Sequence, residues 1–248
     1  KMLIAAGADV NHARTDNGAT PLYIAAGKGH SDVVQMLIAA GAGVNQARTD
    51  DGVTPLYIAA SYGHSPVVKM LIGAGAGVNQ ARTDVGATPL FIAAGKGHSQ
   101  VAKMLIAVRA DVNQATTKDG VTPLYIAASY GHSPVVKMLI GAGADVNPAR
   151  TDDGTTPLYI AASYGHSPVV KMLIGAGADV NPARTDNGAT PLYAAAYYGH
   201  SKVVKMLIAA GADVNQAKTN DGSTPRIGTN FATARALALP DRSLSLAL

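Results

Sequence analysis

One unit of 34 residues recurs along this sequence, and it restricts the possible folds more than any other feature. A glycine opens each copy, at Gly18, Gly52, Gly86, Gly120, Gly154, Gly188 and Gly222. A fixed period of this length is typical of a solenoid, in which one unit is a supersecondary element that cannot bury its apolar face alone. The sequence therefore predicts a stack of copies in which each copy depends on its neighbours.

Each copy has the pattern of two short helices followed by an extended loop. In the second full copy, Thr54 is expected to cap a first helix starting at Pro55, and Gly63 to end it in a left-handed conformation. Ser65 is expected to cap a second helix, which stops at Gly75. The apolar positions expected to be buried are Leu56, Ile58, Val67, Val68, Leu71 and Ile72.

The loop that closes each copy carries its own turn signal. Asp-Gly or Asn-Gly stands at most loop tips, and these dipeptides tolerate positive φ in a tight hairpin. Val85-Gly86 is the exception, so that loop is expected to be looser. Arginines in the loops are followed two or three residues later by Asp, so the tips are expected to be zwitterionic, with Arg of one loop bonding Asp of the next.

The motifs TPLYIAA, GH, VVKMLI and AGADVN recur in phase over about 220 residues and resemble the ankyrin repeat. The unit is one residue longer than the usual 33 of that family. The resemblance implies an all-α ankyrin-repeat solenoid that binds other proteins through a concave surface of loops and first helices. Tyr or Phe replaces the family's histidine after TPL, so the family's histidine hydrogen-bond network is not expected at Tyr23, Tyr57, Phe91, Tyr125, Tyr159 and Tyr193.

The repeats divide the chain into one domain and a short tail. Residues 1–221 form the predicted repeat domain, in which 1–17 is a leading half copy that begins inside a second helix. The full copies are 18–51, 52–85, 86–119, 120–153, 154–187 and 188–221. Residues 222–248 lose the pattern and are expected to form a degenerate cap with a frayed end. The start inside a copy favours a piece of a longer array.

Composition excludes several classes of site. The chain has no cysteine, which excludes disulfides and thiolate metal sites, and all 16 of its acidic residues are aspartates. Its apolar runs are shorter than the ~20 residues that span a bilayer, and the absence of Asn-x-Ser/Thr favours an intracellular, cytoplasmic protein. No phosphate loop, HExxH motif or catalytic set outside the repeat is present, so we expect neither an enzyme nor a cofactor.

Two ladders of side chains have a plain structural interpretation. One histidine per copy follows glycine, and helices packed about 8–10 Å apart cannot let such histidines share a zinc ion at ~2.0–2.1 Å. We therefore expect a structural role in the turn for His30, His64, His98, His132, His166 and His200. The second helices also carry a regular lysine, expected to be solvated rather than to bind phosphate, at Lys69, Lys103, Lys137, Lys171 and Lys205.

The residues just before the Gly-His pair are the best candidates for binding. The resemblance to ankyrin repeats implies that they face the concave groove; the alternative is tyrosines stacking on each other between copies. The candidate partner-binding residues are Tyr62, Lys96, Tyr130, Tyr164, Tyr197 and Tyr198 on the first helices, and Arg48, Arg82, Arg150 and Arg184 in the loops.

The expected partner is another protein, bound by a chain that is monomeric or a subunit of a complex. A structural spacer in a larger assembly is the alternative. A binder of RNA or acidic lipid is less favoured, because a net charge of +4 over 248 residues is small.

Overall fold

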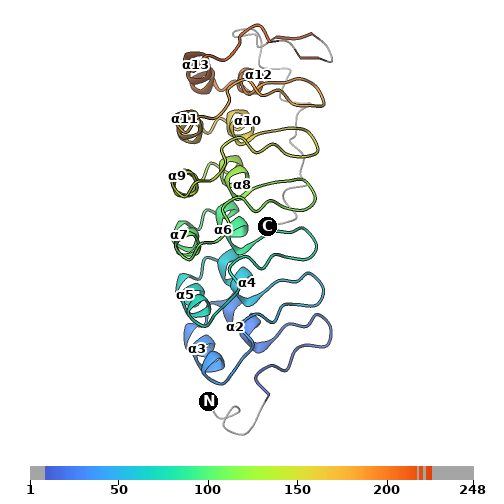
Figure 1. The fold of residues 1–248 in the computed structure, drawn as a ribbon, viewed down its shortest axis with the longest axis vertical. Helices are drawn as coiled ribbons and strands as arrows, with labels where there is room; N and C mark the ends of the chain where they lie inside the picture. Colours follow the sequence, from blue (N-terminus) through green and yellow to red (C-terminus); the bar gives the residue numbers. More distant parts are fainter. Residues whose placement is uncertain (1–8, 217, 220–221, 225–248) are drawn as a thin grey trace. The chain divides into compact units, whose positions relative to one another are not determined.

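The computed structural model describes residues 9–216, 218–219 and 222–224. The chain divides into two compact units, Lys1–Lys118 and Asp119–Leu248. Every regular element within the described ranges is a helix, and the helices come in pairs (Figure 1). The prediction of an all-α repeat is therefore confirmed. Of the predicted half copy at 1–17, residues 1–8 lie outside the described residues, and so does nearly all of the predicted cap at 222–248.

Within each unit, the first helices of successive copies pack on one another, and the second helices form a second layer (Figure 1). The first unit contains α2 (Pro21–Lys28), α3 (Ser31–Ala39), α4 (Pro55–Ser61), α5 (Ser65–Gly73), α6 (Pro89–Gly95) and α7 (Ser99–Ala107). The second unit contains α8 (Pro123–Ser129), α9 (Ser133–Gly141), α10 (Pro157–Ser163), α11 (Ser167–Gly175), α12 (Pro191–Tyr197) and α13 (Ser201–Ala209). A long loop follows each second helix.

The predicted start and end of the first helix are confirmed, but the second helix starts differently. The Thr54 hydroxyl accepts a hydrogen bond from the backbone N–H of Tyr57 at 3.1 Å, and Gly63 has φ 71° after the helix ends. The prediction that Ser65 is an N-cap is wrong, since Ser65 is already helical and His64 precedes it without a side-chain cap. In the following copy, the equivalent Ser99 hydroxyl instead donates to the Gly97 carbonyl at 3.4 Å.

In the second full copy, the buried core differs from the predicted one at two positions. Leu56 and the two valines and leucine of α5 are buried as predicted, but Ile58 and Ile72 are only half-buried. Successive residues turn by about 100° around an α-helix, so Ile58 points well away from Leu56. Tyr57 is buried instead, and the guanidinium of Arg82 in the loop of its own copy lies over its ring.

Three kinds of hydrogen bond join successive copies. The imidazole of His64 bonds the Gly27 carbonyl oxygen through Nε2 at 3.0 Å. The Asn45 side-chain oxygen accepts from the backbone N–H of Gly77 at 2.8 Å. One loop also donates to the one before it, as in the bond from the Thr49 N–H to the Asn17 carbonyl at 3.0 Å. The predicted structural role of the histidines agrees with these bonds.

The loop tips at Gly52, Gly86, Gly154 and Gly188 close with the same backbone turn. In the second copy, Gly52 has φ 70° and donates to the Arg48 carbonyl at 3.1 Å, while the Asp51 carboxylate accepts from the Val53 N–H at 3.1 Å. Glycine alone takes positive φ at these tips. Gly86 makes the same turn with a 3.0 Å bond to the Arg82 carbonyl, so the geometry does not support a looser loop there.

One residue departs from the backbone pattern. Second helices are followed by a glycine with φ between 84° and 89° at Gly41, Gly75, Gly143, Gly177 and Gly211. The equivalent residue after α7 is Arg109, with φ 63°, and no other non-glycine residue in the described ranges has positive φ. The left-handed region is unfavourable for residues with a Cβ atom, so Arg109 carries backbone strain.

Candidate partner-binding surface

The tyrosines before the Gly-His pair lie at the C-terminal ends of the first helices. Tyr62 is the C-cap of α4, Tyr130 of α8, Tyr164 of α10 and Tyr198 of α12. A glycine in the left-handed conformation follows each of them and turns the chain toward the second helix. Each ring is thereby left outside the helix pair, at the same place in its copy.

These tyrosines are exposed, although to different degrees. Tyr62 is 61% exposed, whereas Tyr130, Tyr164 and Tyr198 are 40%, 39% and 40% exposed. We call the last three, which belong to consecutive copies of the second unit, the tyrosine row. In the first unit, Lys96 occupies the corresponding place after α6 and is also exposed.

Each exposed tyrosine packs on the histidine of its own copy. Tyr130 stacks on His132 with ring centroids 6.0 Å apart, and Tyr164 stacks on His166 at 5.9 Å. His166 is itself held by a 2.9 Å hydrogen bond from Nε2 to the Ser129 carbonyl oxygen. The histidines thus support the rings from behind, and the alternative of tyrosines stacked on each other between copies does not describe Tyr130 and Tyr164.

Partial burial affects the acidity of the tyrosine row. Burial raises the pKa of Tyr130, Tyr164 and Tyr198 above the usual value for a phenol. The neighbouring phenols Tyr130 and Tyr198 raise the pKa of Tyr164 further. The three hydroxyls therefore stay protonated, and able to donate hydrogen bonds, at neutral pH.

Tyr197 has a different environment from the tyrosine row. It is half-buried, stacks on Tyr193 with centroids 6.1 Å apart and meets the ring of Tyr198 edge-on at 5.1 Å. Tyr197 and Tyr198 therefore form a pair of contacting aromatic rings at the end of α12.

The loop arginines are engaged inside the repeat array. Arg184 forms hydrogen bonds of 2.8 and 2.6 Å with Asp186 of its own loop, lies 3.3 Å from Asp153 of the preceding loop and covers the ring of Tyr159. Arg48, Arg82 and Arg150 make equivalent pairs with the aspartate two residues later. The arginine holds the pKa of Asp186 below its usual range.

The prediction that an arginine of one loop bonds the aspartate of the next loop is thus corrected. An arginine bonds chiefly the aspartate of its own loop, and it reaches the aspartate of the preceding loop at a longer distance, 4.0 Å from Arg82 to Asp51. The spacing explains this preference, because an aspartate two residues away in the same tight loop can form two hydrogen bonds to one guanidinium. The Arg150 side chain is only 8% exposed and offers little surface to a partner.

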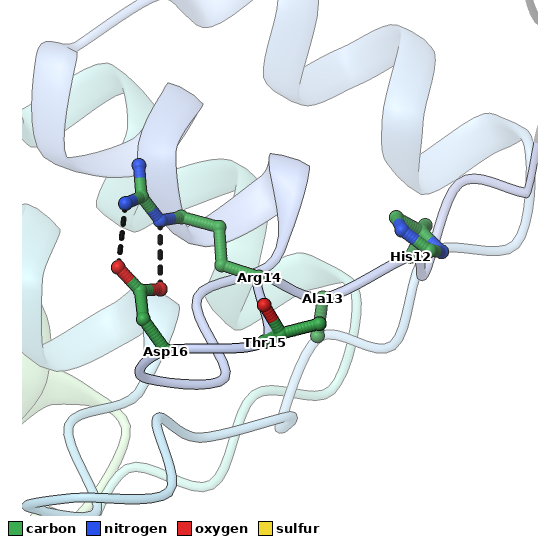
Figure 2. A pocket seen from close by; sticks show the side chains of 5 residues that line it. All are labelled: His12, Ala13, Arg14, Thr15 and Asp16. Atoms are coloured by element: carbon green, nitrogen blue, oxygen red, sulfur yellow. Dashed lines mark hydrogen bonds and ion pairs between the residues drawn. The ribbon is translucent and has the colours of Figure 1, made fainter.

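A pocket of about 430 Å³ lies in the loop that precedes α2. Figure 2 shows its lining residues His12, Ala13, Arg14, Thr15 and Asp16, with Arg14 bonded to Asp16 through Nε at 3.0 Å and Nη2 at 2.6 Å. The Arg14 side chain is 62% exposed, in contrast to the arginines of the interior loops. The pocket is an open surface of one loop, and its two charges neutralise each other.

The part of the chain that the structure describes contains neither a candidate metal site nor a candidate membrane span. Within those ranges no three His or Asp side chains are grouped to hold a metal ion, and no helix is long and apolar enough to cross a membrane. The lysines of the second helices are exposed, as predicted for a solvated face.

Comparison with known proteins agrees with this architecture. A family model for ankyrin repeats in three copies matches residues 1–84, 75–150 and 142–218. The crystal structure of the human ASB11 ankyrin repeat domain is similar, with a TM-score of 0.74 and 28% identity over 87% of this chain and 96% of that chain. No curated protein matches the sequence. The family model covers well over half of the sequence, and the chain belongs to the ankyrin repeat family.

Proposed function

We propose that this chain is a non-catalytic scaffold that binds a partner protein on the surface of its first helices, with the tyrosine row as the main contact. Ankyrin repeats are in general protein–protein interaction modules. The observation that carries the proposal is the row of exposed aromatic rings, one per copy, at Tyr130, Tyr164 and Tyr198. Tyrosine is enriched at binding hot spots because it combines a large rigid ring with a polar tip.

The surroundings of the rings favour binding over a purely structural role. A ring supported by a fixed histidine loses little conformational freedom when a partner covers it, so less of the binding energy is offset by ordering. Tyr197 enlarges the aromatic surface at one end. Tyr62 and Lys96 form a separate candidate surface on the first unit, while the loop arginines act by stiffening the loops.

Two other functions make different demands. A spacer in a larger assembly needs rigid copies but no exposed aromatic row. A binder of anionic surfaces would use the exposed lysines of the second helices, and its affinity would fall steeply with salt concentration.

The test compares two matched double variants. Affinity capture from the native source, quantified by mass spectrometry, uses the wild-type chain, Tyr130→Ala/Tyr164→Ala and Lys137→Ala/Lys171→Ala. We expect a partner that the wild type and the lysine variant retain and the tyrosine variant loses. With the purified partner, the tyrosine variant should bind more than ~2 kcal/mol more weakly, with unchanged helicity.

The opposite result would contradict the proposal. If the lysine variant loses the partner and the tyrosine variant keeps it, the binding surface lies on the second helices. If no variant changes capture, neither helix layer carries the main contact.

A further inference from the structure

We infer that the segment held by the tyrosine row is a neutral, proline-rich stretch in the polyproline II conformation. This inference rests on the proposed function, because it names the class of partner for the same surface. Three properties of the second unit carry it, namely the spacing of the rings, the charge of the first helices and the hydrogen-bonding capacity of the phenols.

The spacing of the copies fits the polyproline II repeat. First helices α8, α10 and α12 pack side by side, and packed helices lie about 8–10 Å apart. A polyproline II helix has three residues per turn and rises ~3.1 Å per residue, so one face repeats about every 9 Å. Every third residue of such a segment would therefore meet the next tyrosine, which corresponds to the pattern Pro-x-x-Pro-x-x-Pro.

Other extended or helical segments fit this spacing less well. A β-strand presents one face about every 6.8 Å, because its side chains alternate. An α-helix returns to the same face about every 5.4 Å. The side chains on one face of a strand are thus closer together than the tyrosines, so a strand that contacts one ring does not contact the next in the same way. In a helix, every second turn would lie between two rings.

The charge of the surface selects a neutral segment. No charged residue occurs in 123–132, 157–166 or 191–200, which contain the first helices and their Gly-His ends. The nearby loops carry charge, but Arg150 and Arg184 are paired with aspartates. An acidic or basic segment would lose hydration here without gaining an opposite charge.

The phenols complement a proline-rich backbone. Proline lacks an N–H group, and a polyproline II segment has no internal hydrogen bonds, so its carbonyl oxygens need external donors. In the described part of the chain, the hydroxyls of Tyr130, Tyr164 and Tyr198 are not engaged in hydrogen bonds. Each ring can therefore stack on a proline and donate its hydroxyl to a carbonyl.

The test uses fluorescein-labelled decaproline with the full chain, measured by fluorescence anisotropy. We expect a dissociation constant below about 1 mM that changes less than twofold between 50 and 500 mM NaCl, since no charges are involved. A Gly-Ser peptide and an alanine-rich helical peptide of the same length should bind at least tenfold more weakly.

Variants then locate the site. Tyr164→Ala should weaken decaproline binding at least tenfold and Tyr164→Phe only a few-fold, because phenylalanine keeps the ring and loses the donor. Lys171→Ala is the matched control, since Lys171 is exposed on the second helix of the same copy and lies outside the tyrosine row, and it should leave affinity unchanged. Circular dichroism checks that each variant stays folded.

Two results would overturn the inference: no binding of decaproline up to several millimolar, or binding that Tyr164→Ala does not change. Neither result bears on the proposed function, which the capture experiment tests with the native partner. If the tyrosine variant loses the native partner while decaproline fails to bind, the surface is right and the polyproline assignment is wrong.

Discussion

Replacing Arg109 by glycine should stabilise the protein. Arg109 has φ 63°, in a region that costs a residue with a Cβ atom about 1–2 kcal/mol. Glycine removes this strain but gains conformational entropy in the unfolded chain, which offsets about 0.5–1 kcal/mol. The net gain expected for Arg109→Gly is therefore about 1 kcal/mol.

The repeat supplies matched controls for this substitution. Gly143 occupies the same place after α9 with φ 84°, and a Cβ atom added there meets nothing within 4 Å. The reverse substitution Gly143→Arg should thus destabilise the protein by a similar amount through the backbone alone. Arg109→Ala removes the charge and keeps the strain, so it should give no gain.

Thermal and urea unfolding followed by circular dichroism measure these effects. A gain of about 1 kcal/mol corresponds to a rise of roughly 2–4 °C in the melting temperature of a chain of this size. An equal gain for Arg109→Ala would show that charge or side-chain crowding, rather than backbone strain, is the cause. No change in Arg109→Gly would refute the argument from the left-handed conformation.

Three further predictions follow from the packing of the copies. Leu158→Ala, at a fully buried position, should cost about 2–5 kcal/mol and lower hydrogen-exchange protection in both neighbouring copies; loss confined to residues 154–187 would contradict coupling between copies. His166→Ala removes the bond to the Ser129 carbonyl and should cost about 1–3 kcal/mol in urea unfolding, whereas an unchanged midpoint would mean that this bond contributes nothing. Burial raises the pKa of Tyr125 to about 12, so the folded state binds this proton more tightly than the unfolded state and stability should fall by up to about 2–3 kcal/mol as the pH rises from 10 to 12. Tyr125→Phe should flatten that fall, and an equally steep fall in this variant would assign it to other groups.

The fold could be predicted from the sequence because its signals are local and repeated. Thr54, Pro55 and Gly63 mark helix ends through their own backbone and side-chain chemistry, and the structure uses them as expected. Ile58 and Tyr57 were harder to place, since burial at these positions depends on which side of the helix the next copy covers. The strain at Arg109 could have been found by aligning the copies, because glycine stands at that place in the others.

The candidate surface could be predicted only in part. The place of Tyr130 and Tyr164 in the repeat indicated that their rings are exposed. Their stacking on His132 and His166 depends on side-chain conformations that the sequence does not specify. The loop arginines were predicted as binding residues because the resemblance to ankyrin repeats implies that the loops line the concave surface. Their side chains instead lie over a tyrosine of the first helix in the same copy, a contact that depends on how the loop folds back along that helix.

Site-specific photo-crosslinking to the native partner tests the central claim most directly. A benzoylphenylalanine at position 164 lies in the tyrosine row, and one at position 171 lies on the second helix of the same copy. We expect the partner to crosslink strongly from 164 and weakly from 171, and the crosslinked peptide of the partner to be identified by mass spectrometry. Strong crosslinking from 171 with none from 164 would contradict the assignment of the first-helix surface as the binding site.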